Sequence, residues 1–235
     1  MGRPVPIGTG NTGWRRRMVE AMSPKDRDPV GPVREALLET VQRLTMVAEY
    51  RDEDAHSHCR RVRYYTEFLV KRLGIPEPDA GVMVFSSPMH DIGKVGIPDS
   101  ILLKQDKLTP QEFEIMKTHT TIGERILGDS SNPYLQSARR FALYHHERWD
   151  GSGYPFGRKG EEIPVEGRMM YLVDKYDTLR SRRPYKPPFR HEAAVLIIAE
   201  GNYSTQPEHF DPEILELFRS NEGVFREIFD SNGQA

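Results

Sequence analysis

Histidine and aspartate side chains recur along about half of this chain in a pattern suited to binding metal ions. Five of the eight histidines take part, and the pattern includes two adjacent pairs. Imidazole nitrogens and carboxylate oxygens suit iron, manganese and zinc. A centre of this kind can activate water against a phosphoester. The candidate ligands are His58, His90, Asp91, His119, His145, His146 and Asp174.

The two adjacent pairs favour a site with two ions. On a helix, His90 and Asp91 would project about 100° apart, because a turn contains about 3.6 residues. Both can then reach metal only near a helix end or between two ions. An aspartate bridging two ions about 3.5–4 Å apart is the usual hydrolytic arrangement. The same reasoning lets His145 and His146 each serve a different ion.

Other residues extend or weaken this prediction. Asp54 lies four residues before His58 on the same helical face and is a possible eighth ligand. Taken alone, His119 is more often a surface or core residue, and Asp174 could cap a helix or form a salt bridge. For all seven residues together, metal binding is the better interpretation. Residues given no metal role are His56, the expected surface residues His191 and His209, and Cys59, which we expect to be a buried thiol.

Cations and a glycine-rich loop suit a phosphate ligand. Lys94 follows His90 by four residues, so it could face the same pocket. Arg183 and Lys186 could neutralise phosphate oxygens, although a basic surface loop explains them equally well. Residues 145–157 read HHERWDGSGYPFG and predict an irregular loop. In that loop Tyr154 could stack on a base, and simple loop packing is the alternative.

The helices that the hydrophobic periodicity predicts must position these candidate residues. Apolar stripes at helical spacing run through residues 33–47 and 62–73, and Thr109-Pro110-Gln111-Glu112 predicts a capping box whose helix runs toward His119. Residues 168–179 and 191–200 look helical, and Asp211-Pro212 should begin another helix. Strand alternation is short or absent. We therefore expect an all-α, compact bundle of roughly seven to nine helices with a metal centre in its core.

Composition sets the outer limits. Residues 1–32 are rich in glycine and proline and contain three consecutive arginines, so we expect a flexible basic arm before one domain at residues 33–235. A net charge of −2 gives no global field for a nucleic acid polymer or an anionic membrane. The lone cysteine fits a reducing compartment. The N-terminus lacks the apolar core of a signal peptide, and we expect a cytoplasmic protein.

The ordered motifs resemble those of the HD-GYP family within the HD phosphohydrolase superfamily. HDIGK at 90–94 and HHERWDGSGYP at 145–155 carry the resemblance, which covers about residues 34–230. Further marks are HSHCRRV (56–62), ILLKQDKLTPQEFEIMKTHTTIG (101–123), DKYDTL (174–179), RPYK (183–186) and FDP (210–212). The resemblance implies an all-α fold, cyclic di-GMP phosphodiesterase activity and a centre of two or three metals that often contains iron.

Roles carry over position by position. The seven candidate ligands match the metal ligands of the family, with Asp91 as the bridge. Lys94 matches a lysine near the scissile phosphate, and Arg183 and Lys186 match residues that engage the ligand. The GYP residues 153–155 would shape the pocket and meet a signalling partner such as a diguanylate cyclase domain. Members with three metals carry glutamate where this chain has Asp54, so we expect two ions, iron or manganese.

The resemblance implies attack by metal-activated hydroxide on one phosphorus of cyclic di-GMP, which gives pGpG and, in a second round, GMP. Three alternatives stay open. The substrate could be another cyclic dinucleotide such as 3′,3′-cGAMP. A broader HD nucleotidase is less favoured because of the GYP loop. The chain could also be an adaptor that binds cyclic di-GMP without hydrolysing it, against which the intact ligand set argues.

Overall fold

The computed structural model describes residues 40, 43, 55–182 and 187–232. Contacts divide the chain into two units, residues 1–43 and 44–235, and all that follows concerns the second. The apolar stripe expected at 33–47, the arm at 1–32 and the boundary between them lie outside the described residues.

The described part of the second unit consists of helices and connecting segments. Its order is α3 (Ala55–Arg72), α4 (Asp79–Ser86), the 3₁₀ segment η1 (Ser87–Gly96), α5 (Asp99–Leu102), α6 (Pro110–Lys117), α7 (His119–Leu127), α8 (Pro133–Tyr144), η2 (Gly160–Glu162), α9 (Val165–Arg180), α10 (His191–Glu200), η3 (Pro207–His209), α11 (Pro212–Ser220) and α12 (Glu222–Ser231). The all-α prediction is confirmed for these residues. They contain ten α-helices, more than expected, because α5 is one turn long and too short for a periodic pattern.

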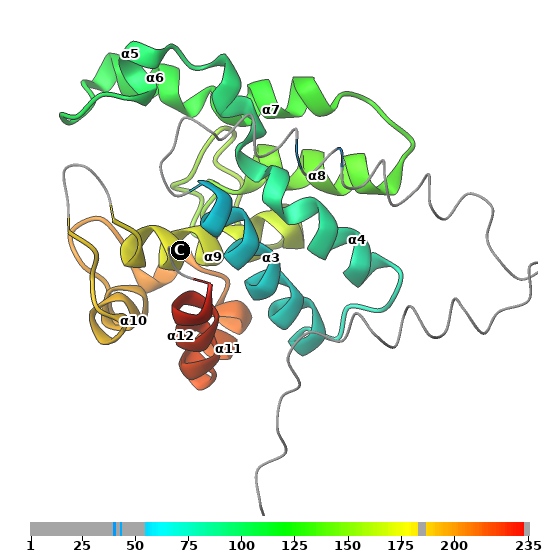
Figure 1. The fold of residues 1–235 in the computed structure, drawn as a ribbon, viewed down its shortest axis with the longest axis vertical. Coiled ribbons are helices and arrows are strands. Elements are labelled where there is room, and N and C mark those ends of the chain that lie inside the picture. Colours follow the sequence, from blue (N-terminus) through cyan, green and yellow to red (C-terminus); the bar gives the residue numbers. More distant parts are fainter. Residues whose placement is uncertain (1–39, 41–42, 44–54, 183–186, 233–235) are drawn as a thin grey trace, which may run out of the picture. The chain divides into compact units, whose positions relative to one another are not determined.

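The 3₁₀ segment η1 lies at the junction of the helices that matter for the site. It packs against α3, α7, α8 and α9, and Figure 1 shows these helices gathered around it. His90 and Asp91 occupy the middle of η1 and are buried. In a 3₁₀ helix adjacent side chains project about 120° apart, so His90 and Asp91 face different neighbours among the surrounding helices.

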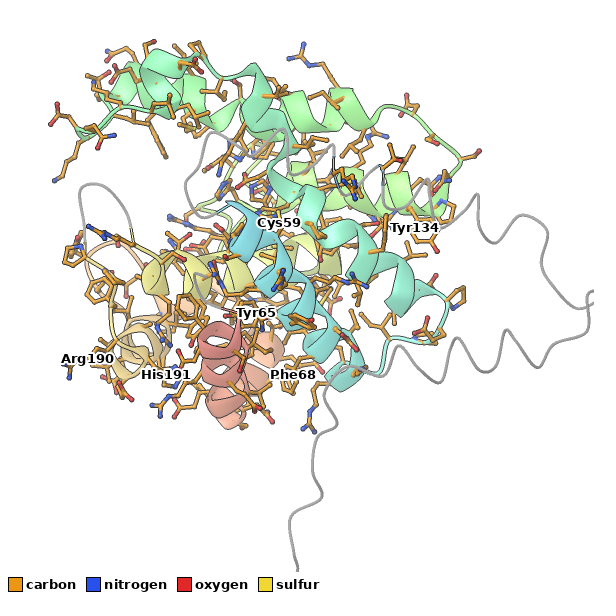
Figure 2. All side chains as sticks on the ribbon, viewed as in Figure 1. Cys59, Tyr65, Phe68, Tyr134, Arg190 and His191 are labelled. Atoms are coloured by element: carbon orange, nitrogen blue, oxygen red, sulfur yellow. The ribbon has the colours of Figure 1, made fainter. Side chains whose placement is uncertain are left out.

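Aromatic rings fill the core between α3, α9 and the C-terminal helices. Tyr65 stacks on Phe225 with ring centroids 5.0 Å apart, and Phe68 meets the same ring edge-on at 5.8 Å. Figure 2 shows Tyr65 and Phe68 on α3 beside α12. Such pairs add about 0.5–1.5 kcal/mol each beyond the burial of their area. This core fixes α3 and α9, which carry two of the candidate ligands, relative to each other.

The helix starts predicted from capping residues are confirmed, whereas the helices predicted at 62–73 and 168–179 begin earlier, at Ala55 and Val165. Thr109 and Glu112 form a capping box at the start of α6, and α7 begins at His119. Asp211 caps α11 by accepting hydrogen bonds from the backbone of Glu213 and Ile214. Cys59 is buried, as expected. Among the described helices, none combines the length and apolar character needed to cross a membrane.

Candidate metal centre

Six of the predicted ligands meet as two triads. His58 on α3, His90 on η1 and Asp174 on α9 each bring a ligand atom within 4.8 Å of the others, and we call this the first triad. The second triad meets the same limit and consists of His119 at the start of α7 with His145 and His146, which follow α8. Residues far apart in the sequence are thus brought together as the ligand pattern predicts.

Asp91, the seventh predicted ligand, lies between the triads. Its Oδ2 atom is 3.5 Å from Nε2 of His90 in the first triad. Its Oδ1 atom is 3.4 Å from Nε2 of His119 and 3.6 Å from Nε2 of His145 in the second. One carboxylate therefore presents one oxygen to each triad, which is the geometry of a bridging ligand.

Hydrogen bonds at the rear of the rings point the front nitrogens into the centre. The Nδ1–H groups of His90 and His119 donate to the backbone oxygens of Ser87 and Met116 at 3.1 and 2.7 Å. His145 donates in the same way to the oxygens of Phe141 and Ala142. Each bond selects the tautomer whose Nε2 lone pair faces inward, as in protein sites where histidine binds metal.

Burial and charge set the protonation states that a cation requires. Burial lowers the pKa of His90 to about 3 and that of His119 to about 4, so both rings are neutral near pH 7. Burial and the neighbouring His145 hold the pKa of His146 well below its usual range. Burial opposes ionisation of Asp91, but the Lys94 ammonium beside it outweighs this effect and keeps the pKa of Asp91 well below the usual range.

Two observations show that this arrangement fits metal cations. The Nε2 atoms of His119 and His145 lie 3.1 Å apart, and those of His58 and His90 lie 3.4 Å apart. Lone pairs facing each other at such distances repel unless a cation lies between them, and burial disfavours protonation of the rings. In addition, the buried Oδ1 of Asp91 accepts no hydrogen bond from the described residues. The donor set and its geometry therefore suit a pair of divalent ions.

Lys94 faces the same centre, as predicted. Its Nζ atom lies 2.5 Å from Oδ2 of Asp91, and its side chain is partly exposed. Gly93, beside it, allows η1 to approach α7 closely, because an added Cβ would lie 1.9 Å from the backbone oxygen of His119. The HDIGK motif thus combines two candidate ligands, a close helix contact and a cation within one short segment.

The glycine-rich loop folds tightly behind His146. The backbone N–H of Tyr154 donates to the oxygen of His146 at 3.1 Å, and the two rings stack with centroids 4.7 Å apart. A Cβ at Gly153 would lie 2.3 Å from the backbone nitrogen of Arg148, which only glycine avoids. One face of the Tyr154 ring is therefore used to hold a candidate ligand. Its stacking on a base stays a prediction.

Two carboxylates that support the candidate site were missed by sequence reasoning. Asp177 accepts a hydrogen bond from Nδ1 of His58 at 2.8 Å, and Glu147 accepts the backbone N–H groups of Phe156 and Arg158 at 2.8 and 3.0 Å. Asp177 follows Asp174 by three residues on one helical face, and Glu147 directly follows the histidine pair. Their closeness in the sequence to predicted ligands is the signal that could have identified them. Glu147 holds the GYP loop through these hydrogen bonds, and Asp177 contacts the rear nitrogen of His58.

Other predicted residues stand apart from this centre. Asp54, Arg183 and Lys186 lie outside the described residues. The expectation that His191 and His209 are surface residues is wrong, because both are buried. His191 hydrogen-bonds the Tyr176 hydroxyl at 2.9 Å, and Nδ1 of His209 accepts from the backbone of Gln206 at 3.2 Å. The partners of His191 lie on another helix, so local spacing did not reveal them.

Comparisons with known proteins agree with this geometry. The HD domain family model matches residues 39–214. A cyclic di-GMP phosphodiesterase from Thermotoga maritima is 45% identical over 193 residues, which cover 82% of this chain and 51% of the relative. A 3′3′-cGAMP-specific phosphodiesterase from Vibrio cholerae is 40% identical over 185 residues, which cover 79% of this chain and 35% of the relative. The chain thus spans about half the length, or less, of these curated relatives.

A solved structure matches the fold. It is an HDG"Y"P protein from Bdellovibrio bacteriovorus, with a TM-score of 0.53 and 18% sequence identity. The match covers 74% of this chain and 51% of that chain. At this identity the likeness concerns the helical architecture alone.

Proposed function

Because this chain belongs to the HD domain family and carries the HD-GYP signature, we propose that it is a metal-dependent phosphodiesterase of cyclic dinucleotides. Its substrate is cyclic di-GMP, and its products are linear pGpG and, after a second hydrolysis, GMP. The observation that carries the proposal is the position of Asp91, which presents one oxygen to each of two triads. The 45% identity to a cyclic di-GMP phosphodiesterase supports the choice of substrate.

The proposed ligand assignment follows the triads. His58, His90 and Asp174 would hold one ion, and His119, His145 and His146 would hold the other. Asp91 would offer one carboxylate oxygen to each site. Because Asp54 stands where a three-metal site would need a longer glutamate, we propose two ions, iron or manganese. Two bound divalent ions would lower the pKa of water enough to supply hydroxide near neutral pH and would neutralise charge on the phosphoryl oxygens.

The side chains of the chain then orient and stabilise the reacting groups. The rear hydrogen bonds of the histidines keep each ring fixed, so little reorganisation is needed during the reaction. The Lys94 ammonium, 2.5 Å from Asp91, is placed to stabilise the negative charge that develops on the phosphoryl group. With the ions bound, an oxygen from water would attack phosphorus in line with the 3′-oxygen; the new P–O bond would form as the P–O3′ bond breaks, and the 3′-oxygen would leave as a hydroxyl after taking up a proton. Arg183 and Lys186 remain proposed contacts to the substrate.

A second substrate is favoured by one comparison. The 40% identity to a 3′3′-cGAMP-specific phosphodiesterase makes that cyclic dinucleotide the alternative. Both substrates contain the same phosphodiester linkage chemistry, and they differ in one base. We also propose that the GYP loop contacts a signalling domain, such as a diguanylate cyclase domain. Phe156, directly after that motif, is 59% exposed and supports this proposal.

The test is hydrolysis of cyclic di-GMP and 3′,3′-cGAMP, side by side, by protein loaded with Mn²⁺ or, without oxygen, with Fe²⁺. Faster turnover of cyclic di-GMP to pGpG or GMP is the expected result. Faster turnover of 3′,3′-cGAMP would reassign the substrate. Binding of cyclic di-GMP by fully metal-loaded protein without any hydrolysis would show that the protein acts as an adaptor and not as an enzyme.

A further inference from the structure

A buried carboxylate–arginine pair lies directly behind the first triad. Asp177 Oδ2 accepts from His58 Nδ1 at 2.8 Å and from the Arg61 guanidinium at 2.8 Å. Its other oxygen, Oδ1, accepts from Nε of Arg61 at 2.6 Å. Both side chains are about 1% exposed. This fork-like pairing is among the strongest side-chain hydrogen bonding in proteins and fixes both planes.

The same guanidinium also holds the end of the last described helix. Arg61 donates to the backbone oxygen of Asn232, the C-cap of α12, at 3.4 Å. Its guanidinium carbon lies 4.6 Å from the centre of the Phe229 ring. Arg180, on α9, approaches that ring to 4.4 Å and pairs with Asp230 at 2.9 Å. Helix α12 is thus attached to α3 and α9 beside the first triad.

We infer that Asp177 and Arg61 are positioning residues, which orient His58 for the first metal ion and connect that ion to the docking of α12. This inference rests on the proposed metal-dependent function and deepens it. Asp177 touches neither substrate nor metal in this account. It acts through the His58 ring, and Arg61 acts through Asp177.

His58 differs from three of the other candidate ligands in the group that its rear nitrogen contacts. The Nδ1 groups of His90, His119 and His145 donate to backbone oxygens, which the helices hold in place. His58 donates instead to a side-chain carboxylate, which Arg61 holds through two hydrogen bonds. A carboxylate acceptor also makes the opposite ring nitrogen a better ligand. Loss of the pair should therefore weaken the first triad selectively.

The connection to α12 follows from linkage. If docked α12 helps hold Arg61, and Arg61 holds Asp177, metal binding to the correctly oriented His58 favours the docked helix. The reciprocal statement is that undocking α12 weakens metal binding at the first triad by the same factor. Metal should therefore slow backbone exchange in residues 222–231, although these residues contribute no ligand.

The test compares Mn²⁺ affinities at the two triads. Asp177→Asn leaves the Arg61 charge poorly compensated in the core, and such variants can unfold. The double variant Asp177→Asn/Arg61→Met removes both charges at similar volume and guards against that outcome. We expect the first triad to lose about 10- to 100-fold in affinity, as is typical when an outer-shell partner of a metal ligand is removed, and the second triad to change little. His58→Ala and His146→Ala identify which binding step belongs to which triad.

Glu166→Gln is the matched control. Glu166 lies on the same helix and is also buried, and its hydrogen bonds, from Arg140 at 2.6 Å and from Ser137 at 3.4 Å, involve no member of either triad. It should lower thermal stability as the Asp177 variant does while leaving both Mn²⁺ affinities unchanged. Wild-type affinity at the first triad in the folded double variant would overturn the inference. Equal weakening in Glu166→Gln would also overturn it, since the effect would then be general destabilisation.

Hydrogen exchange tests the connection to α12 without any turnover. Residues 222–231 should exchange more slowly with Mn²⁺ than without it in the wild type, and this difference should vanish in the double variant. Equal exchange rates for residues 222–231 with and without Mn²⁺ in the wild-type protein would overturn the connection. The Mn²⁺ titrations report binding at each triad and require no turnover. They therefore distinguish a failure of this inference from a failure of the proposed enzyme activity. Normal metal binding with no hydrolysis would defeat the proposed enzyme and leave the positioning role standing.

Discussion

The Nε2 atoms of His119 and His145 face each other at 3.1 Å, from the start of α7 and from the residue after α8. The rear nitrogen of each ring donates to a backbone oxygen. The fold therefore directs two lone pairs at one point inside the protein. This is costly without a cation and favourable with one.

Metal removal should accordingly destabilise the protein. An ion that binds only the folded state adds about 2.7 kcal/mol to the free energy of unfolding at 100 times its Kd. We expect a lower Tm in EDTA than in Mn²⁺, measured by thermal unfolding. The difference should shrink in His119→Ala, which removes a ligand. Equal Tm values for wild-type protein in EDTA and in Mn²⁺ would argue against a metal centre.

Lys94 should matter for the rate more than for metal binding. Lys94→Met removes the ammonium 2.5 Å from Asp91 but removes no ligand. We expect kcat for the cyclic dinucleotide to fall roughly 100- to 1000-fold, as when one charge-stabilising donor is lost. Metal content should stay at the wild-type value. Lys71→Met, on the exposed surface of α3, is the control and should change neither quantity. Unchanged kcat in Lys94→Met would contradict the proposal that Lys94 stabilises charge on the phosphoryl group.

Gly153 should be intolerant of a side chain. In Gly153→Ala the added Cβ would meet the backbone of Arg148 at 2.3 Å, so the loop behind His146 must shift. We expect a loss of about 1–3 kcal/mol in stability and weaker metal binding at the second triad. Gly223→Ala is the control, because its Cβ meets nothing described within 4 Å and it lies in α12. Denaturant unfolding and metal titration would show both effects, and equal behaviour of the two variants would refute the packing argument.

Much of the centre was predictable because its residues carry strong local signals. Adjacent pairs such as His90-Asp91 cannot both face one ion from a regular helix, so a position between two sites follows from helix geometry. The capping box at Thr109 likewise determines where α6 begins. In both cases the residue types that do the work lie close together in the sequence.

The remaining features depend on contacts between distant residues. Asp177 looks like an ordinary helix residue until the fold brings Arg61 and His58 to it from α3. His191 was expected at the surface because its hydrogen-bond partner, Tyr176, lies on α9. Such pairing between distant residues cannot be read from the sequence pattern. Hydrophobic periodicity indicates which face of a helix is buried, but it does not indicate which residues pack against that face.

The most direct test is anaerobic turnover of cyclic di-GMP by manganese- or iron-loaded protein, with metal per chain determined on the same sample, for wild type and Asp91→Ala. We predict conversion to pGpG or GMP by wild-type protein with about two metals. A count near three would place Asp54 among the ligands. Asp91→Ala should keep its helical spectrum and lose turnover, because the carboxylate between the triads is gone. Folded Asp91→Ala that hydrolyses at the wild-type rate would contradict the account.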